Sequence, residues 1–153
     1  TTRARYSLRA LIDIARHQEG GPVRAADVAE RQQVSQGYLE RILNHLVEAE
    51  LIQSRKGPGG GFLLARPIKD ITVRQVFRAS GEELLTAPCL YDDCESECPL
   101  SSTCPARDVW SGLRNVADEY LEGRTLAEFC DPSFRAGGEK KNGLRPLRSS
   151  AGS

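Results

Sequence analysis

Residues 34–43 read VSQGYLERIL and begin the segment that decides the fold. Ser35 belongs to the residue types that cap helix N-termini, so we expect a helix from this residue to about Glu50. Apolar residues recur along the segment with the spacing that places them on one helical face. They are Leu39, Ile42, Leu43, Leu46 and Val47. The segment therefore predicts an amphipathic helix that packs on a core and keeps a polar face in solvent.

The chain on either side of this helix supplies the rest of a small fold. Upstream, one helix is predicted from about Arg3 to His17, ended by Gly20-Gly21-Pro22, and a shorter one from Ala25 to Gln32. Downstream, strands are predicted at 51–55 and 61–65, joined by the glycine-rich sequence KGPGG. Three helices followed by a hairpin is the layout of a winged helix-turn-helix, a mainly α fold with a small β-hairpin wing.

The second half of the chain is predicted to contain another long helix. Thr72 is expected to cap a short helix, and an acidic loop that contains cysteines follows it. A long helix is predicted from about Pro105 to Glu122, then a short helical turn at 125–129 and, from about Ser133, a disordered Gly/Lys/Arg/Ser-rich tail. The apolar stripe of the long helix is broad, although little chain is left to cover it. Its residues are Val109, Trp110, Leu113, Val116, Ala117, Tyr120 and Leu121.

Length and composition indicate one modest domain. The chain has 153 residues, of which 39% are hydrophobic; this is a lean supply for a core, so dimerisation would add buried surface. No run of eighteen apolar residues occurs, which excludes a membrane span, and the lack of a signal-peptide pattern predicts a cytoplasmic protein. Residues 1–70 carry 11 basic and 8 acidic side chains, whereas residues 71–131 carry 5 and 12. The mildly basic front half is therefore the part suited to a polyanion.

Two polar features of the front half suit nucleic acid. The first turns of the amphipathic helix carry Gln36, Glu40 and Arg41, whose hydrogen-bonding groups match base edges in the major groove. Arg55 and Lys56 stand at the mouth of the glycine-rich hairpin, and a basic tip of this kind suits the minor groove. The alternatives are the solvated face of an ordinary helix and a plain hairpin turn.

Four cysteines fall within sixteen residues, in the stretch CLYDDCESECPLSSTC. The gaps of four, three and five residues are short enough for one loop to place four thiolates around one metal centre. Thiolates favour iron–sulfur clusters, zinc and Cu(I), and in a reducing compartment clustered cysteines more often bind metal or sense redox state than form disulfides. Structural zinc is the main alternative, although the usual paired CxxC knuckles are missing. The four are Cys89, Cys94, Cys98 and Cys104; the remaining Cys130 is expected to be a buried, inert thiol.

No catalytic pattern accompanies these features. The two histidines, His17 and His45, are distant in sequence from each other and from the cysteine loop. A Ser–His–Asp order, paired carboxylates and a nucleotide fingerprint are all missing. We therefore expect a protein that is not an enzyme.

Four stretches together resemble the Rrf-two family of bacterial transcription regulators, in particular its IscR-like iron–sulfur members. They are TTRARYSLRALIDIA, VSQGYLERIL, RKGPGGGFLL and the loop that ends CPARDVW, and they span about residues 1–130. The resemblance implies a homodimer that binds a pseudo-palindromic operator in double-stranded DNA, with the long helix crossing its dimer mate. It implies DNA contacts from the first helix, the recognition helix and the wing. By position these are Thr2, Arg3, Arg5, Ser35, Gln36, Gly37, Tyr38, Glu40, Arg55, Lys56, Gly57 and Pro58, to which the side-chain chemistry adds Arg41.

The cysteine loop departs from the family pattern at the fourth ligand. Cluster-binding relatives use three loop cysteines and one other residue, either a His after the last cysteine or an Asp from the partner's first helix. The corresponding positions here are Arg107 and Arg5, and a guanidinium cannot ligate iron. The resemblance and the extra cysteine together suggest that four thiolates hold a [2Fe–2S] or [4Fe–4S] cluster, the latter preferred. The alternative is that one of Cys89 and Cys94 is a spare thiol.

These features combine into one hypothesis, a transcription regulator, specifically a repressor, whose operator affinity depends on an iron–sulfur cluster. Two rivals remain: a metal-free regulator controlled by thiols or by a partner, and a small redox protein that uses the same cysteines and does not bind DNA. The main hypothesis divides the chain into a DNA-binding domain (1–80), a cluster-binding loop (81–104), a dimerisation helix with a short terminal helix (105–131) and a flexible tail (132–153).

Overall fold

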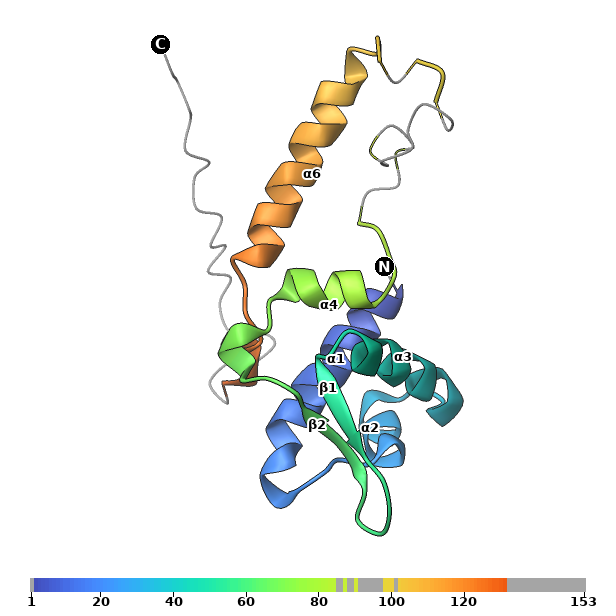
Figure 1. The fold of residues 1–153 in the computed structure, drawn as a ribbon, viewed down its shortest axis with the longest axis vertical. Coiled ribbons are helices and arrows are strands. Elements are labelled where there is room, and N and C mark those ends of the chain that lie inside the picture. The colour runs from blue at the N-terminus through green and yellow to red at the C-terminus, as the bar shows by residue number, and fades with distance from the viewer. Residues whose placement is uncertain (1, 85–86, 88–89, 91–97, 101, 132–153) are drawn as a thin grey trace.

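The computed structural model describes residues 2–84, 87, 90, 98–100 and 102–131. Figure 1 shows a body of packed helices and a hairpin at one end of the molecule, and the helix α6 that extends from it. The predicted tail from residue 132, and the cysteines at positions 89 and 94, lie outside the described residues. The mainly α architecture with one small hairpin confirms the predicted fold class.

Three helices form the body around one core. They are α1 (Thr2–His17), α2 (Ala25–Gln32) and α3 (Gln36–Glu48), within a residue or two of the predicted bounds. The α2–α3 turn is tight because Gln33 adopts a left-handed conformation (φ 56°) and its N–H closes back onto the end of α2. The core draws on every element of the body, with a buried set that includes Leu11, Ile14, Val28, Leu39, Ile42, Leu43, Leu46, Ile52 and Ile71.

A hairpin completes the winged helix. Strands β1 (Ile52–Arg55) and β2 (Gly61–Leu64) pair antiparallel, with Ile52 opposite Leu64. A bridge that the sequence did not predict adds Val23 to the other edge of β2, through mutual backbone hydrogen bonds of 2.9 and 2.8 Å with Phe62. A Cβ at Gly61 would lie 2.5 Å from the Val23 carbonyl oxygen, so this close approach requires glycine.

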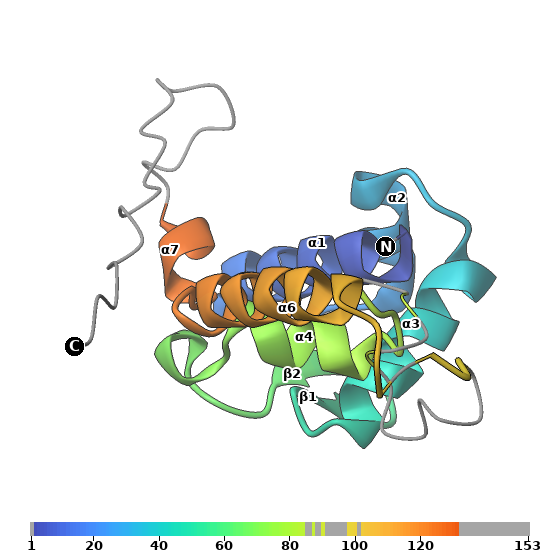
Figure 2. The ribbon, with the colours of Figure 1, turned by 90° about the horizontal axis from the view of Figure 1, so that it is seen from above.

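The elements that follow the hairpin pack against the body through α4 and α7. Helix α4 (Val73–Ala79) begins with a capping box in which Thr72 and Gln75 satisfy each other's backbone N–H groups. Helix α6 (Ala106–Glu122) leads into α7 (Ala127–Cys130), and the buried Leu126 donates its N–H to the Ile71 carbonyl at 2.9 Å. Figure 2 shows α6 over α4 when the molecule is seen from above, with α7 beside α1. Short 3-10 turns at Gln18–Gly20 and Ile68–Asp70 complete the element order.

None of the helices in the described part of the chain combines the length and the apolar character needed to cross a bilayer. The longest, α6, has 17 residues.

Candidate nucleic-acid interface and cysteine loop

The first turns of α3 present the polar groups that the sequence singled out. Ser35 caps the helix, since its hydroxyl accepts a hydrogen bond of 3.4 Å from the Tyr38 N–H. Gln36 and Glu40 are exposed and joined to each other, with the Gln36 amide donating to the Glu40 carboxylate at 2.8 Å. A Cβ built on the exposed Gly37 meets no atom within 4 Å, so another surface can approach the backbone there. The N-terminal part of α3 is therefore an accessible, preorganised polar face.

Aromatic and arginine side chains connect this face to the start of α1. The rings of Tyr6 and Tyr38 meet edge to face, with centroids 5.8 Å apart and planes at 89°. The Arg41 guanidinium lies 5.8 Å from the Tyr38 ring centroid, and those of Arg5 and Arg9 each lie 5.1 Å from the Tyr6 centroid. Arginines from two helices thus surround one pair of rings. Sequence reasoning missed Arg9, although its position one turn after Arg5 in a predicted helix placed both on one face.

The wing carries the second predicted group of contacts. Arg55, Lys56, Gly57 and Pro58 are all exposed. Figure 1 shows the hairpin loop extending from the body on the side away from α6. Gly57 and Gly59 have positive φ angles of 95° and 75°, conformations that favour glycine. The glycine run is therefore needed to form the loop that presents the two cations, and it also leaves the tip slim.

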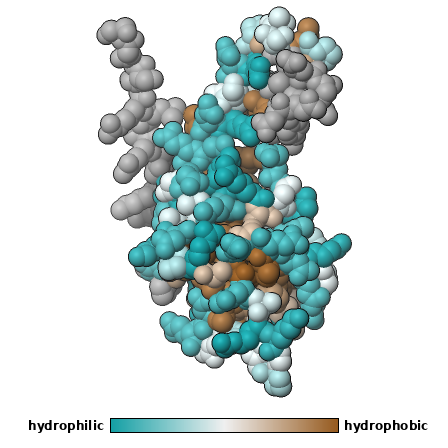
Figure 3. Space-filling model, viewed as in Figure 1, coloured by the Kyte–Doolittle hydropathy of each residue, from teal (hydrophilic) through white to brown (hydrophobic). Residues whose placement is uncertain are grey.

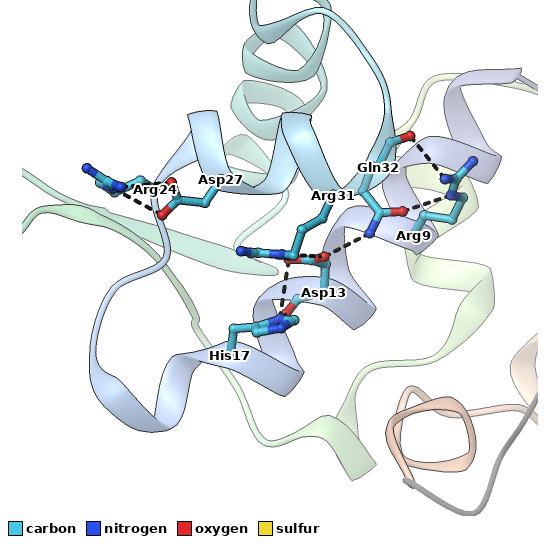
Figure 4. A network of polar contacts seen from close by, with 7 residues as sticks. All are labelled: Arg9, Asp13, His17, Arg24, Asp27, Arg31 and Gln32. Atoms are coloured by element: carbon cyan, nitrogen blue, oxygen red, sulfur yellow. Dashed lines mark hydrogen bonds and ion pairs between the residues drawn. The ribbon is translucent and has the colours of Figure 1, made fainter.

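A polar network around the buried Asp13 carboxylate fixes the position of α1 against α2 (Figure 4). The Asp13 carboxylate, with only 4% of its side chain exposed, accepts hydrogen bonds from Arg31 at 2.6 Å and from the Gln32 amide at 2.8 Å. Arg9 donates to the Gln32 side-chain oxygen at 2.9 Å and to its backbone carbonyl at 3.0 Å. Hydrogen bonding to Asp13 raises the pKa of Arg31 above its ordinary value. The network therefore holds Arg9, and with it the Tyr6 ring, in a defined place. No sequence signal pointed to this pairing.

The structure describes two of the four loop cysteines. Cys98 and Cys104 are both half-buried and free of disulfide bonds. Cys104 sits on a turn in which its N–H and that of Thr103 both donate to the Leu100 carbonyl, at 2.9 and 3.0 Å, just before α6 begins. Within the described ranges no three His, Cys, Asp or Glu side chains form a group that could hold a metal. Two free thiols six positions apart in the chain are compatible with soft-metal ligation. The four-cysteine site stays a prediction.

Cys130 lies apart from this loop. It packs against the core from α7 but is half-buried rather than fully buried as expected. Burial raises the pKa of its thiol, an effect that the nearby Arg16 partly opposes. The thiol is therefore less reactive than an exposed cysteine, in keeping with the predicted inert role.

Helix α6 displays an apolar stripe that the described part of the chain leaves exposed. None of its residues, all of which the structure describes, is buried. Val109, Leu113, Val116 and Tyr120 are 65%, 47%, 42% and 51% exposed and recur with the spacing of one helical face. On the face drawn in Figure 3, the part of the molecule that contains α6 is mostly hydrophilic, with a few brown, hydrophobic groups between. A stripe of this size is typical of a protein–protein contact.

Comparison with known proteins agrees with this geometry. The model of the Rrf2 family, described as an iron-dependent transcriptional regulator, matches residues 1–132. The HTH-type transcriptional regulator IscR of Yersinia pseudotuberculosis is 34% identical over 131 residues, which are 86% of this chain and 78% of that protein.

Solved structures show the same likeness. The structure of T. potens IscR has 30% sequence identity to this chain and a TM-score of 0.69. The match covers 90% of this chain and 92% of the T. potens chain. The structure of CymR, the global cysteine regulator of B. subtilis, is 25% identical with a TM-score of 0.67, and covers 85% of this chain and 94% of its own. These relatives are regulators and not enzymes, as the sequence predicted. The chain belongs to the Rrf2 (Rrf-two) family of winged helix-turn-helix transcription regulators.

Proposed function

We propose that this regulator binds a specific, pseudo-palindromic operator in double-stranded DNA through α3 and the wing, and that it acts as a repressor. The observation that carries the proposal is the exposed polar face at the start of α3, with Gln36, Glu40 and Arg41 all accessible. Their donors and acceptors suit base edges in the major groove. Arg55 and Lys56 on the wing would contact phosphates or the minor groove beside it. Because the target is chromosomal DNA, we place the protein in the cytoplasm.

The regulator works as a homodimer in this proposal. The exposed stripe Val109, Leu113, Val116 and Tyr120 supports it, because two copies of α6 would cover each other's apolar faces. A two-fold dimer presents two recognition helices, and successive major-groove sites are about 34 Å apart. The inclination of α6 relative to the body would therefore decide whether the two α3 helices of the dimer fit successive major-groove sites of one operator.

The cysteine loop is the sensing element in this proposal. Cys89, Cys94, Cys98 and Cys104 would hold an iron–sulfur cluster, of the [4Fe–4S] or the [2Fe–2S] type. When bound, such a group supplies an iron centre whose stability depends on oxidants and on iron supply. The chain's own contribution is four soft donors on a loop that ends at the first turn of α6. Changes in this loop would thus act directly on the dimerisation helix.

A second candidate mechanism is control without metal, through thiols or a partner protein. It is favoured by the likeness to CymR, a cysteine regulator, and by the two free thiols at Cys98 and Cys104. Zinc in place of the cluster is a third possibility. Anaerobic purification followed by an absorption spectrum and counts of iron, sulfide and zinc separates the three. Visible absorption with two or four irons per chain supports the cluster, whereas colourless, metal-free protein that still represses supports thiol control.

DNA binding is tested with an operator selected from random DNA. Glu40→Ala should weaken binding to this operator about tenfold and change its base preference, because one base contact is typically worth about 1–3 kcal/mol. Lys56→Ala should weaken binding to all sequences alike and reduce its salt dependence. Glu48→Ala, at the far end of the same helix, is the matched control and should leave affinity unchanged. If Glu40→Ala and Lys56→Ala bind this operator like wild type, α3 and the wing do not read it. If wild type selects no DNA sequence at all, the redox-protein hypothesis takes its place.

A further inference from the structure

Three ionisable side chains connect α4, α6 and the cysteine loop. Arg74 of α4 donates a hydrogen bond to one carboxylate oxygen of Asp118 on α6, and the other oxygen lies 4.0 Å from the Nε atom of Arg114. Arg114 also donates to the backbone carbonyl of Leu90. The side chains of Arg74, Asp118 and Arg114 are 17%, 27% and 37% exposed, so all three are partly shielded from water. We call this set the Arg74–Asp118–Arg114 chain.

The two ends of this chain lie at the two functional parts of the molecule. Leu90, at the loop end, is buried and directly follows Cys89 in sequence. At the body end, α4 buries Val73 and Val76 and packs against α1 and α3. A single run of charged contacts therefore leads from the backbone beside a candidate ligand to the helix that supports the DNA-facing helices.

Other hydrogen bonds join the two helices at the start of α4, where the Thr72 hydroxyl donates to Glu122 at 3.3 Å and the Val73 N–H donates to the Arg124 carbonyl at 2.9 Å. A cleft of about 260 Å³ lies between the two helices, and its lining includes all three members of the chain together with Phe77 and Leu121. No residue of α6 is fully buried, and its apolar residues on this side, Ala117 and Leu121, are half-buried, so apolar packing alone fixes its inclination only weakly. Charge-assisted hydrogen bonds between partly shielded groups are stronger than exposed ion pairs and depend on geometry. They are thus the contacts most able to set how α6 meets the body.

We propose that the Arg74–Asp118–Arg114 chain couples the state of the cysteine loop to the DNA-binding helices, an inference that rests on the proposed function. Asp118 is shared between two guanidinium groups, and one of these also holds the loop backbone. When the loop rearranges and the Leu90 carbonyl moves, Arg114 is released toward Asp118 and competes with Arg74 for it. The position of α4, and through it that of α1 and α3, then depends on the loop. The three are positioning residues, with no contact to DNA required of them.

The test compares Asp118→Asn with Glu119→Gln, a matched loss of one carboxylate at the next, exposed position of α6. Operator dissociation constants are measured for metal-free reduced protein and for protein reconstituted anaerobically with iron and sulfide. Allosteric couplings are commonly about 5–150-fold, and we expect Asp118→Asn to reduce the wild-type ratio at least about threefold. Glu119→Gln should keep the ratio. Iron content should match wild type in both variants, because no ligand is changed.

A second readout does not depend on DNA. Amide hydrogen exchange in α4 should differ between the two forms of wild-type protein and become equal in Asp118→Asn. Arg114→Gln should have the same effect, and the double variant should add nothing further, because both changes break one chain. If wild type shows the coupling and Asp118→Asn retains it in both readouts, the inference is overturned while the proposed function stands. If wild type binds no operator, or binds it equally in both forms, the proposed sensing function fails and this coupling fails with it.

Discussion

In the winged-helix body, Leu11, Leu43 and Leu46 are completely buried, whereas Val109 and Leu113 of α6 are 65% and 47% exposed. The helices of both regions carry apolar residues at the same helical spacing. They differ in what covers the apolar face: the helices of the body cover one another, whereas among the described residues α6 contacts the body along one side and leaves its apolar stripe exposed. A comparison of this kind shows that periodicity predicts a buried face but does not say which molecule buries it. We therefore expect the body to be stable by itself and α6 to be stabilised by the proposed second copy.

The largest effect should come from opening the core of the body. Leu43→Ala removes a completely buried side chain and should lower the free energy of unfolding by about 2–5 kcal/mol. This loss should be the same at low and high protein concentration, as measured by urea unfolding. Val109→Ala on α6 is the control. It should lower the free energy of unfolding only at concentrations where the protein is dimeric. A concentration-dependent loss for Leu43→Ala would mean that the body, too, needs the partner.

The next largest effect should come from disrupting the proposed dimer contact on α6. Leu113→Glu places a charge in the middle of the exposed stripe, and a contact at the centre of an interface is commonly worth about 2 kcal/mol or more. We expect the dimer dissociation constant to rise at least about thirtyfold by sedimentation equilibrium, with the helical content of the monomer preserved. Asn115→Glu, on the polar side of the same helix, should leave the dimer intact. Equal behaviour of the two variants would rule out this stripe as the interface.

Breaking the polar network around Asp13 should have a smaller effect. Asp13→Asn leaves Arg31 without its charged partner in a partly shielded place, and should cost about 1–3 kcal/mol of stability. Asp27→Asn breaks the exposed ion pair with Arg24 and should change thermal unfolding very little. Because the Asp13 network also holds Arg9 beside the Tyr6 ring, Asp13→Asn should weaken DNA binding as well. Similar melting temperatures for the two variants would show that the buried Asp13 contributes no more to stability than the exposed Asp27.

The smallest effect concerns thiol reactivity where α7 packs against the body. Burial raises the pKa of Cys130, so at pH 8 a smaller fraction is thiolate than in an ordinary exposed cysteine. In a variant whose four loop cysteines are replaced by serine, Cys130 should react with iodoacetamide more slowly than free N-acetylcysteine. The pH at which the rate reaches half of its maximum should be higher for Cys130 than for the reference thiol. A rate equal to that of the reference would show that α7 does not shield the thiol.

Much of the fold could be predicted because the decisive signals are local. Ser35 and Thr72 cap their helices as expected, and the bounds of α3, β1 and β2 fall within about two residues of those expected. Contacts between residues far apart in sequence were not predictable. The Val23–Phe62 bridge and the Glu82 carboxylate that accepts the Ala4 N–H at 3.0 Å are examples. Neither has a sequence pattern, since each depends on how whole elements dock.

The candidate sites likewise contain some residues that could be predicted from the sequence and others that could not. The exposed groups on α3 and on the wing could be named from the sequence. An amphipathic helix buries its apolar stripe against whatever it packs on, and this leaves the opposite, polar face in solvent. The roles of Arg9, Arg74 and Asp118 could not be, since an arginine or aspartate in a helix gives no indication of its partner. The four cysteines were evident from their spacing, and their shared role as ligands stays a prediction.

The sequence by itself determined the order and type of the elements, the polar face of α3 and the crowding of soft donors before α6, because each follows from short-range periodicity and residue chemistry. Tertiary structure alone decided which charges meet. The free energy of an ion pair depends on distance and shielding, and Arg74 reaches Asp118, 44 positions away, only because α4 and α6 pack against each other. That docking, rather than any motif, joins α6, and through Arg114 the backbone of Leu90, to the winged-helix body.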